Sequence, residues 1–358
     1  PTVTAEDKKA MDKPVPIDRA MILLGFAFAA AWIVTAGMAA HFPRILEATG
    51  ASPAQAIAAG ALIGPAQVGA RMIEASVLGR FHPLASARLA TLTHPVGVAV
   101  ILAAGGGVAA SAFAVLHGSG NGACGHSKFK GNYPALVEAG YRVILTDLIG
   151  FGYSDKPDDV EYPLSFFVEC VKQTLDAIGV ERYTLVGNSL GGAVALGFAL
   201  EHPRNVERLV LMAPGGVSDM PEYQAMPGMA ALFAHLATGK PFTHDTMKAF
   251  FIKAFVVDPS FVDDQLVAER LELMKLQNPQ VMKTMKVPNM TERLGEIKAP
   301  ALVLWGINEN MMPENGILRL AKGIPNCRLV TIPHCGHWVM IEHRELFNRL
   351  VLDFLKNG

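Results

Sequence analysis

The apolar positions of this chain follow two different patterns on either side of about residue 112. Before that point, long apolar stretches continue without charge, whereas after it short β-branched runs alternate with longer helical stretches. Short buried strands that alternate with helices are typical of a parallel sheet covered by helices. The pattern therefore predicts an all-helical, apolar region at 1–111, followed by an α/β domain.

Six short apolar runs are the predicted strands of this domain. They are 113–116, 141–145, 183–186, 209–211, 301–305 and 328–332. The predicted helices are 133–139, 164–179, 190–201, 314–323 and 343–356. A Pro-Gly-Gly turn at 214–216 opens a long stretch that breaks the alternation. We therefore predict a core formed by 112–215 and 293–358, with a helical cap at 216–292.

The region before residue 112 is nearly free of charge, because residues 20–116 contain only six of the 63 formal charges. The runs 21–40 and 96–116 match the roughly 20 apolar residues that a membrane-spanning helix requires. The run 54–70 is weaker, since Gly60, Gly64 and Pro65 interrupt it. The alternative interpretation is a set of core helices in a soluble protein. We favour membrane helices, which predicts membrane contact through residues 21–116.

Composition excludes two classes of function. With 31 Lys and Arg against 32 Asp and Glu, the chain lacks the basic surface of a nucleic-acid-binding protein. Its four cysteines stand far apart and form no C-x-x-C pair, which argues against a disulfide scaffold and against a zinc site. We expect reduced cysteines in a cytoplasmic domain, and a small apolar partner molecule.

A candidate nucleophile follows the predicted strand at 183–186. The run Gly-Asn-Ser-Leu-Gly at 187–191 lies between that strand and an Ala- and Leu-rich helix that stops before Pro203. This is the context in which G-x-S-x-G forms a nucleophile elbow, because its glycines relieve the crowding of a sharp turn. Ser189 is therefore the predicted nucleophile.

An acid and a base follow in the chain order that this fold requires. Glu309 lies just beyond the strand at 301–305, and two histidines, His334 and His337, follow the strand at 328–332. A serine hydroxyl needs a base to take its proton, and the resulting imidazolium needs an anion that fixes its tautomer. We predict His337 as the base and Glu309 as the acid, with His334 as the less favoured base.

A glycine-rich run, His-Gly-Ser-Gly-Asn-Gly at 117–122, follows the first predicted strand. We expect the backbone N–H groups of Ser119 and Leu190 to form an oxyanion hole for a tetrahedral intermediate. An ordinary loop is the alternative interpretation.

From residue 117 to the C-terminus the chain resembles the α/β-hydrolases, and among them the meta-cleavage product hydrolases, which cut carbon–carbon bonds in aromatic degradation. The motifs that carry the resemblance are 117–122, 139–144, 150–155, 187–192, 211–216 and 335–338. Such a protein has a sheet with a helical cap. The resemblance implies hydrolysis of a 2-hydroxy-6-oxohexa-2,4-dienoate type of compound, with no metal and no organic cofactor.

Carried over residue by residue, the resemblance implies substrate contacts for Gly118, Asn188 and Trp338. It also places Arg270 of the cap where such enzymes hold the substrate carboxylate, a task that suits the planar fork of arginine. Family members mostly have Asp at the position of Glu309. Asp219, soon after the strand at 209–211, is therefore a second candidate for the acid.

Residues of about 15–120 resemble instead a fragment of a major facilitator superfamily transporter, through Phe-Pro-Arg at 42–44 and the runs at 60–65 and 79–83. Two strands that normally open a hydrolase sheet are missing from this stretch. Moreover, 113–116 cannot be both a buried strand and the end of a spanning helix. Three functions remain open: a carbon–carbon hydrolase that acts on a dienoate, a carboxylesterase with the same triad, or an inactive transporter-fragment fusion. A homo-oligomer is also expected.

Overall fold

The structure, a computed structural model, describes Arg19, Ile22 and residues 112–357. Apart from Arg19 and Ile22, the predicted helical region at 1–111 lies outside the described residues. This includes the rest of the predicted membrane run at 21–40, the run at 54–70 and the transporter-like motifs. None of the helices in the described part of the chain combines the length and the apolar character needed to cross a membrane.

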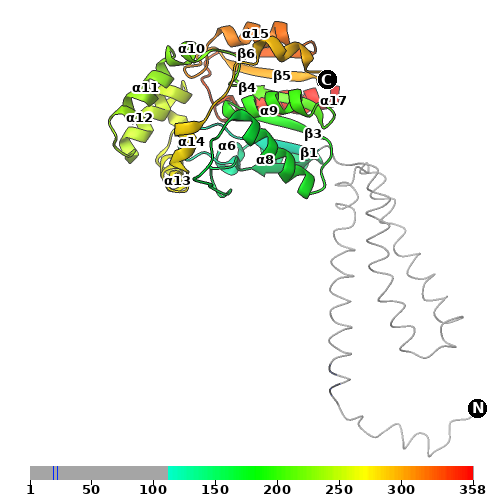
Figure 1. Cartoon of the computed structure of the whole chain (residues 1–358), viewed down its shortest axis with the longest axis horizontal. Helices are drawn as coiled ribbons and strands as arrows, with labels where there is room; N and C mark the ends of the chain where they lie inside the picture. The colour runs from blue at the N-terminus through cyan, green and yellow to red at the C-terminus, as the bar shows by residue number, and fades with distance from the viewer. Residues whose placement is uncertain (1–18, 20–21, 23–111, 358) are drawn as a thin grey trace, which may run out of the picture. The chain divides into compact units, whose positions relative to one another are not determined.

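The described domain is built on one parallel sheet of six strands, whose order is β2-β1-β3-β4-β5-β6. The strands are β1 (Ala112–Leu116), β2 (Arg142–Thr146), β3 (Tyr183–Asn188), β4 (Val206–Met212), β5 (Ala301–Gly306) and β6 (Cys327–Ile332). Each predicted strand is present, within a few residues of its predicted ends. The chain therefore has the parallel sheet of an α/β domain (Figure 1).

Helices connect these strands or follow the last of them. They are α6 (Gly125–Phe129), α7 (Tyr133–Glu138), α8 (Leu164–Ala177), α9 (Leu190–Glu201), α15 (Asn315–Gly323), α16 (Val339–Glu342) and α17 (Arg344–Asn357). The prediction missed the short helices α6 and α16, which contain only five and four residues. One to two turns are too few to show a helical period in the sequence.

Residues 216–292, which we call the cap segment, contain no strand and are helical. Its helices are α10 (Met220–Gln224), α11 (Pro227–Ala237), α12 (His244–Phe255), α13 (Asp264–Met274) and α14 (Pro279–Thr284), with the 3-10 turns η2 (Pro259–Phe261) and η3 (Thr291–Glu296). In Figure 1, α11, α12 and α13 lie together to one side of the sheet.

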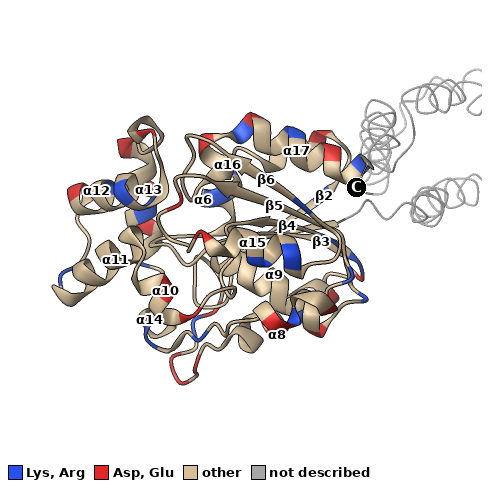
Figure 2. Ribbon diagram, turned by 90° about the horizontal axis from the view of Figure 1, so that it is seen from above, with Lys and Arg blue, Asp and Glu red and all other residues tan. Residues whose placement is uncertain are grey.

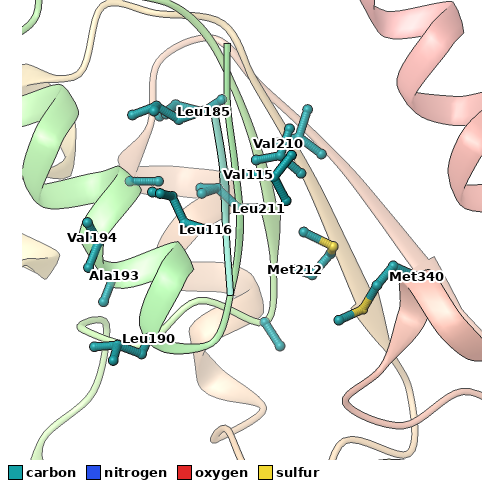
Figure 3. Packing of buried hydrophobic residues seen from close by; sticks show 14 of the residues in the cluster. Val115, Leu116, Leu185, Leu190, Ala193, Val194, Val210, Leu211, Met212 and Met340 are labelled. Atoms are coloured by element: carbon teal, nitrogen blue, oxygen red, sulfur yellow. The ribbon is translucent and has the colours of Figure 1, made fainter. Parts of the chain in front are cut away.

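The core lies between the sheet and the helices on its two faces. Helix α9 contacts β1, β3 and β4, and α8 packs against α9. Helices α6, α7, α15 and α16 also contact the sheet. Side chains of neighbouring strand residues point to opposite faces, as Leu211 and Met212 do in Figure 3. Because α9 is apolar all round, it is buried on every side from Leu190 to Ala199.

Strand β1 corrects one prediction about the N-terminal region. The run 96–116 was predicted to cross a membrane, but its last five residues, Ala112–Leu116, form a fully buried strand between β2 and β3. Pairing on both sides satisfies the backbone of these residues in the sheet, which a helix could not do at the same time. The remaining part of that run lies outside the described residues.

Strand β2 forms one edge of the sheet, and its residues are only partly buried. The stretch before β1, where two opening strands are expected to be missing, lies outside the described residues apart from Arg19 and Ile22. The charged side chains lie mostly on the outer helices, such as α15 and α17, while β3 and β5 carry none (Figure 2).

His117 joins the end of β1 to the loop after β2 through a buried imidazole. The Leu148 N–H donates to His117 Nε2 at 3.0 Å, so the proton is on Nδ1, which lies 2.8 Å from the Gly118 carbonyl oxygen. Burial lowers the pKa of His117 to about 4. The folded domain therefore holds this ring neutral at neutral pH.

We expect His117 to make the domain lose stability as pH falls. Below about pH 6.5 the imidazole of His117 is protonated in the unfolded chain, whereas in the folded chain it stays neutral down to about pH 4. The free energy of unfolding should therefore fall by about 3 kcal/mol between these two pH values. Urea unfolding at pH 7, 5.5 and 4.5 should show this loss in the native chain and a shallower dependence in His117→Gln. Equal pH dependence in both chains would contradict the assignment.

Candidate active site

Ser189 stands at a strained turn between β3 and α9. Its φ is 57° and its ψ is −118°, a conformation that non-glycine residues rarely adopt. The two flanking glycines make this turn possible: a Cβ on Gly187 would lie 2.4 Å from the Gly191 carbonyl oxygen, and one on Gly191 would lie 2.1 Å from the Leu116 carbonyl oxygen. The turn raises Ser189 above the carboxyl end of the sheet, where the sequence predicts it.

His337 and Glu309 meet although 27 residues separate them in the chain. They follow β6 and β5, whose carboxyl ends lie at the same edge of the sheet. His337 Nδ1 lies 2.7 Å from Glu309 Oε2, and the two side chains are 2 % and 3 % exposed. Because a carboxylate only accepts, Nδ1 carries the proton and Nε2 is left as the basic nitrogen.

Glu309 is itself held by backbone groups. Its Oε1 accepts from the Met311 N–H at 2.6 Å and from the Met312 N–H at 3.2 Å. Oε2 is thereby aimed at His337, and the longer side chain of glutamate is accommodated without losing contact with the ring. The pair matches the predicted acid and base in position, and their catalytic roles stay a prediction.

The two other candidates for these roles are placed elsewhere. Asp219 is exposed, caps α10 and accepts from Asn289 Nδ2 at 2.9 Å, so it does not reach His337. His334 is also exposed, and its carbonyl oxygen accepts from His343. Asp219 therefore serves the start of a helix, and neither Asp219 nor His334 lines the cavity that Ser189 lines.

Glu342, which the sequence did not single out, anchors the loop that carries His337. Its carboxylate accepts from the Gly336 N–H and from the Val257 N–H, each at 2.6 Å. The Phe255 carbonyl oxygen also accepts from the Trp338 N–H. These bonds tie the histidine loop to the end of α12. A lone glutamate at the start of an amphipathic stretch offers no sequence signal for such a role.

Ser189 and His337 line the same cavity, which has a volume of about 210 Å³. Gly118, Ser119 and Leu190 line it as well. The glycine-rich run is close to the nucleophile, since a Cβ on Gly118 would lie 3.0 Å from Ser189 Cβ. Among the described residues, the N–H groups of Ser119 and Leu190 have no carbonyl partner. They are therefore free for the predicted oxyanion.

The rest of the cavity wall is apolar and comes largely from the cap segment. Its apolar lining includes Met220, Met229, Leu232, Phe233, Phe250, Met282, Met285, Val287, Met311 and Met312. Methionines make adaptable contacts with ligands of different shape. The wall therefore suits an uncharged group, in line with the apolar partner that the composition predicts.

Three of the predicted substrate contacts, Asn188, Trp338 and Arg270, are buried side chains. Asn188 lines the cavity, but its Nδ2 is 3.2 Å from the carbonyl oxygens of both Met212 and His337, so it also joins the nucleophile strand to the histidine loop. Trp338 and Arg270 are buried and are not part of the cavity wall. Phe255 stacks on Trp338, and Arg270 Nη2 would lie 3.5 Å from a Cβ on Gly120, which lines the cavity. The substrate contacts of Trp338 and Arg270 stay predictions.

Lys128 is a cationic wall residue that the sequence analysis missed. It belongs to α6, is 3 % exposed, and lines the cavity together with Ser189 and His337. Its position between His126 and Lys130 is typical of a solvated surface turn, so the local sequence gives no sign that this side chain turns inward. Nothing among the described residues forms a cluster of ligands suited to a metal ion.

Residues 112–344 match the family model described as the alpha/beta hydrolase fold. The chain belongs to the α/β-hydrolase family. Several of its relatives are hydrolases of meta-cleavage products.

The chain is 41% identical over 255 residues to a 2-hydroxy-6-oxononadienedioate/2-hydroxy-6-oxononatrienedioate hydrolase of Comamonas testosteroni, a match that covers 68% of this chain and 87% of the relative. It is 39% identical to a 2-hydroxy-6-oxo-6-phenylhexa-2,4-dienoate hydrolase of Burkholderia cepacia, with the same coverage of each chain. The solved structure of a meta-cleavage product hydrolase from Pseudomonas fluorescens superimposes with a TM-score of 0.60 at 28% identity, and covers 69% of this chain and 90% of that one.

Proposed function

We propose that this protein hydrolyses the carbon–carbon bond of a 2-hydroxy-6-oxohexa-2,4-dienoate type of meta-cleavage product. The observation that carries the proposal is the buried His337–Glu309 pair on the wall of the cavity that Ser189 also lines. The substrate class is supported by the names of the relatives, which act on dienoates of this kind. No cofactor is needed for the reaction.

The proposed reaction begins when the dienol ketonises, which moves the proton of the 2-hydroxyl to C5. Ser189 Oγ then adds to the C6 carbonyl carbon while His337 Nε2 takes its proton. The N–H groups of Ser119 and Leu190 stabilise the oxyanion at C6. Cleavage of the C5–C6 bond moves its electron pair through the alkene to the oxygen at C2, which takes the proton from His337. The 2-hydroxydienoate is released, His337 is neutral again, and an acyl group remains on Ser189.

Water completes the reaction. His337, again the base, takes a proton from water, which attacks the acyl carbon and releases the carboxylic acid and the free serine. Glu309 keeps the proton of the ring on Nδ1 and stabilises the imidazolium in both halves of the reaction. One water is consumed, and the products are a dienoate and an acid. Helices α10–α14 would act as the cap that shields these steps.

A turnover assay with soluble and membrane fractions of the full chain tests this proposal. A dienoate should be cleaved far faster than a p-nitrophenyl ester. Cleavage of the ester alone would identify a carboxylesterase with the same triad, and no turnover of either would favour the inactive transporter-fragment fusion. We also propose a cytoplasmic catalytic domain, membrane contact through residues 21–116 and a homo-oligomer. Activity in the membrane fraction would support the membrane contact, and activity in the soluble fraction alone would contradict it. Sedimentation of the same sample tests the homo-oligomer.

We expect the enzyme to prefer an apolar substituent at C6. The wall formed by Met220, Met282, Met285 and their neighbours offers no cation to a second carboxylate, and burial of an unpaired charge is costly. The value of kcat/KM for a phenyl- or alkyl-substituted dienoate should therefore exceed that for a nonadienedioate by about 100-fold or more. Ser189→Ala, which should lose both activities, is the control. Equal rates with both substrates would show that this wall does not select the substituent.

A further inference from the structure

Two backbone segments meet beside the candidate base. One is the loop after β6, which carries His337, and the other is the end of α12 in the cap segment. The Trp338 N–H donates to the Phe255 carbonyl oxygen at 3.1 Å, and a Cβ on Gly336 would lie 2.7 Å from that same oxygen. The Phe255 ring also stacks on the His337 ring, with 5.7 Å between their centroids. The base therefore rests against the cap segment.

Glu342 reaches into this contact from α16. Its Oε2 accepts from the Gly336 N–H at 2.6 Å. Its Oε1 accepts from the Val257 N–H at 2.6 Å and from the Asp258 N–H at 3.3 Å. The residue is only 9 % exposed, and hydrogen bonds to an ionised acceptor are about twice as strong as neutral ones. One buried carboxylate thus bonds the residue before His337 on one side and the cap segment on the other.

The core holds the histidine loop by separate bonds. Asn188 Nδ2 lies 3.2 Å from the His337 carbonyl oxygen, and the Asn308 N–H donates to the Cys335 carbonyl oxygen at 2.9 Å. These bonds fasten the backbone of the loop to β3 and to the turn after β5. Neither of them reaches the cap segment, so Glu342 supplies a hold that the core does not.

We propose that Glu342 is a positioning residue for His337, and that it sets the direction of the imidazole by fastening the histidine loop to the end of α12. The catalytic part of this assignment rests on the proposed function, which takes His337 as the base. With both segments held, the ring keeps its Nδ1 on Glu309 and its Nε2 for the proton of Ser189. A misplacement of about 1 Å in a catalytic group can cost about 100-fold in rate. The position of the base therefore depends on the cap segment as well as on the core.

Glu342→Gln tests the assignment with little change of shape. An amide has one acceptor oxygen, and its NH2 group would face a backbone N–H group in place of the other oxygen. The bond to Gly336 or the bond to Val257 is therefore lost. We expect kcat for dienoate cleavage to fall by about 100-fold with KM within about 2-fold of native, because Glu342 does not line the cavity. The matched control is Glu345→Gln, the same change at an exposed carboxylate in the first turn of α17, which should keep native kcat.

A spectroscopic signal follows the ring without any turnover. In the full chain labelled with isotopic histidine, the proton on His337 Nδ1, which faces Glu309 Oε2 at 2.7 Å, should give a far-downfield NMR resonance that His337→Gln lacks. Glu342→Gln should lose or broaden this resonance, and Glu345→Gln should keep it. If Glu342→Gln keeps both the resonance and native turnover, the assignment is wrong. Absence of the resonance from the native chain would contradict it as well, since the ring would then not be held.

Gly336→Ala approaches the same contact from the loop, and it decides the case if the melting temperature shows that Glu342→Gln does not fold. The added Cβ would press on the Phe255 carbonyl oxygen, so the loop should move away from α12 and kcat should again fall with little change in KM. Native kcat in Gly336→Ala would overturn the assignment. If Glu342→Gln loses the resonance but the native chain cleaves no dienoate, the proposed function is wrong and the positioning of the ring by Glu342 stands.

Discussion

Ser189→Ala is expected to lower kcat for dienoate cleavage by at least about 10,000-fold, because the nucleophile of a serine triad carries most of its catalytic effect. The backbone need not change, since alanine keeps the Cβ atom and only the hydroxyl is lost. Steady-state turnover of the purified variant measures the effect, and an unchanged melting temperature is the control for folding.

The same variant also tests how the C6 carbonyl is attacked. If Ser189 forms the acyl intermediate and loss of the acyl group is the slower step, rapid mixing of native enzyme with excess substrate should show a burst of dienoate. Ser189→Ala should show no burst. If water adds to the ketone directly, the variant should keep much more activity. Turnover within 10-fold of native would rule out Ser189 as the nucleophile.

Glu309→Gln is expected to lower kcat by about 1,000- to 10,000-fold with little change in KM. The amide can present an N–H group to His337 Nδ1, which favours the tautomer whose Nε2 carries the proton and cannot take one from Ser189. The 2.7 Å contact of the native carboxylate excludes that tautomer. The rate under saturating dienoate, compared between native and variant, measures the effect.

Asp219→Asn is the matched control for Glu309→Gln, since it makes the same change of a carboxylate to an amide at the other acid considered. Asp219 caps α10 far from the ring, so its loss should affect the start of that helix and leave kcat within about 2-fold. A large loss in Asp219→Asn together with native activity in Glu309→Gln would reverse the assignment of the acid. Glu309→Asp, one methylene shorter, should fall between native and Glu309→Gln.

The strands and long helices could be predicted from the sequence because each carries its own periodic signal. Strand β3 and helix α9 are both strongly apolar, and the glycines at 187 and 191 mark the turn between them. The start of the α/β domain is harder to predict, because the apolar run at 96–116 is compatible with a helix as well as with a strand. Only the pairing of Ala112–Leu116 with β2 and β3 identifies these five residues as a strand. Pairing in a sheet is a property of distant segments.

In the candidate site, too, some features could be predicted from the sequence and others only from the tertiary structure. The sequence by itself determined the fold class, the elbow at Ser189 and the order of serine, acid and histidine, because these depend on residues adjacent in the chain. Only the tertiary structure decided that Glu309 rather than Asp219 meets His337, that Arg270 is not part of the cavity wall, and that Lys128 is. The direction of a side chain depends on the helices and loops packed around it, and no local pattern records those contacts.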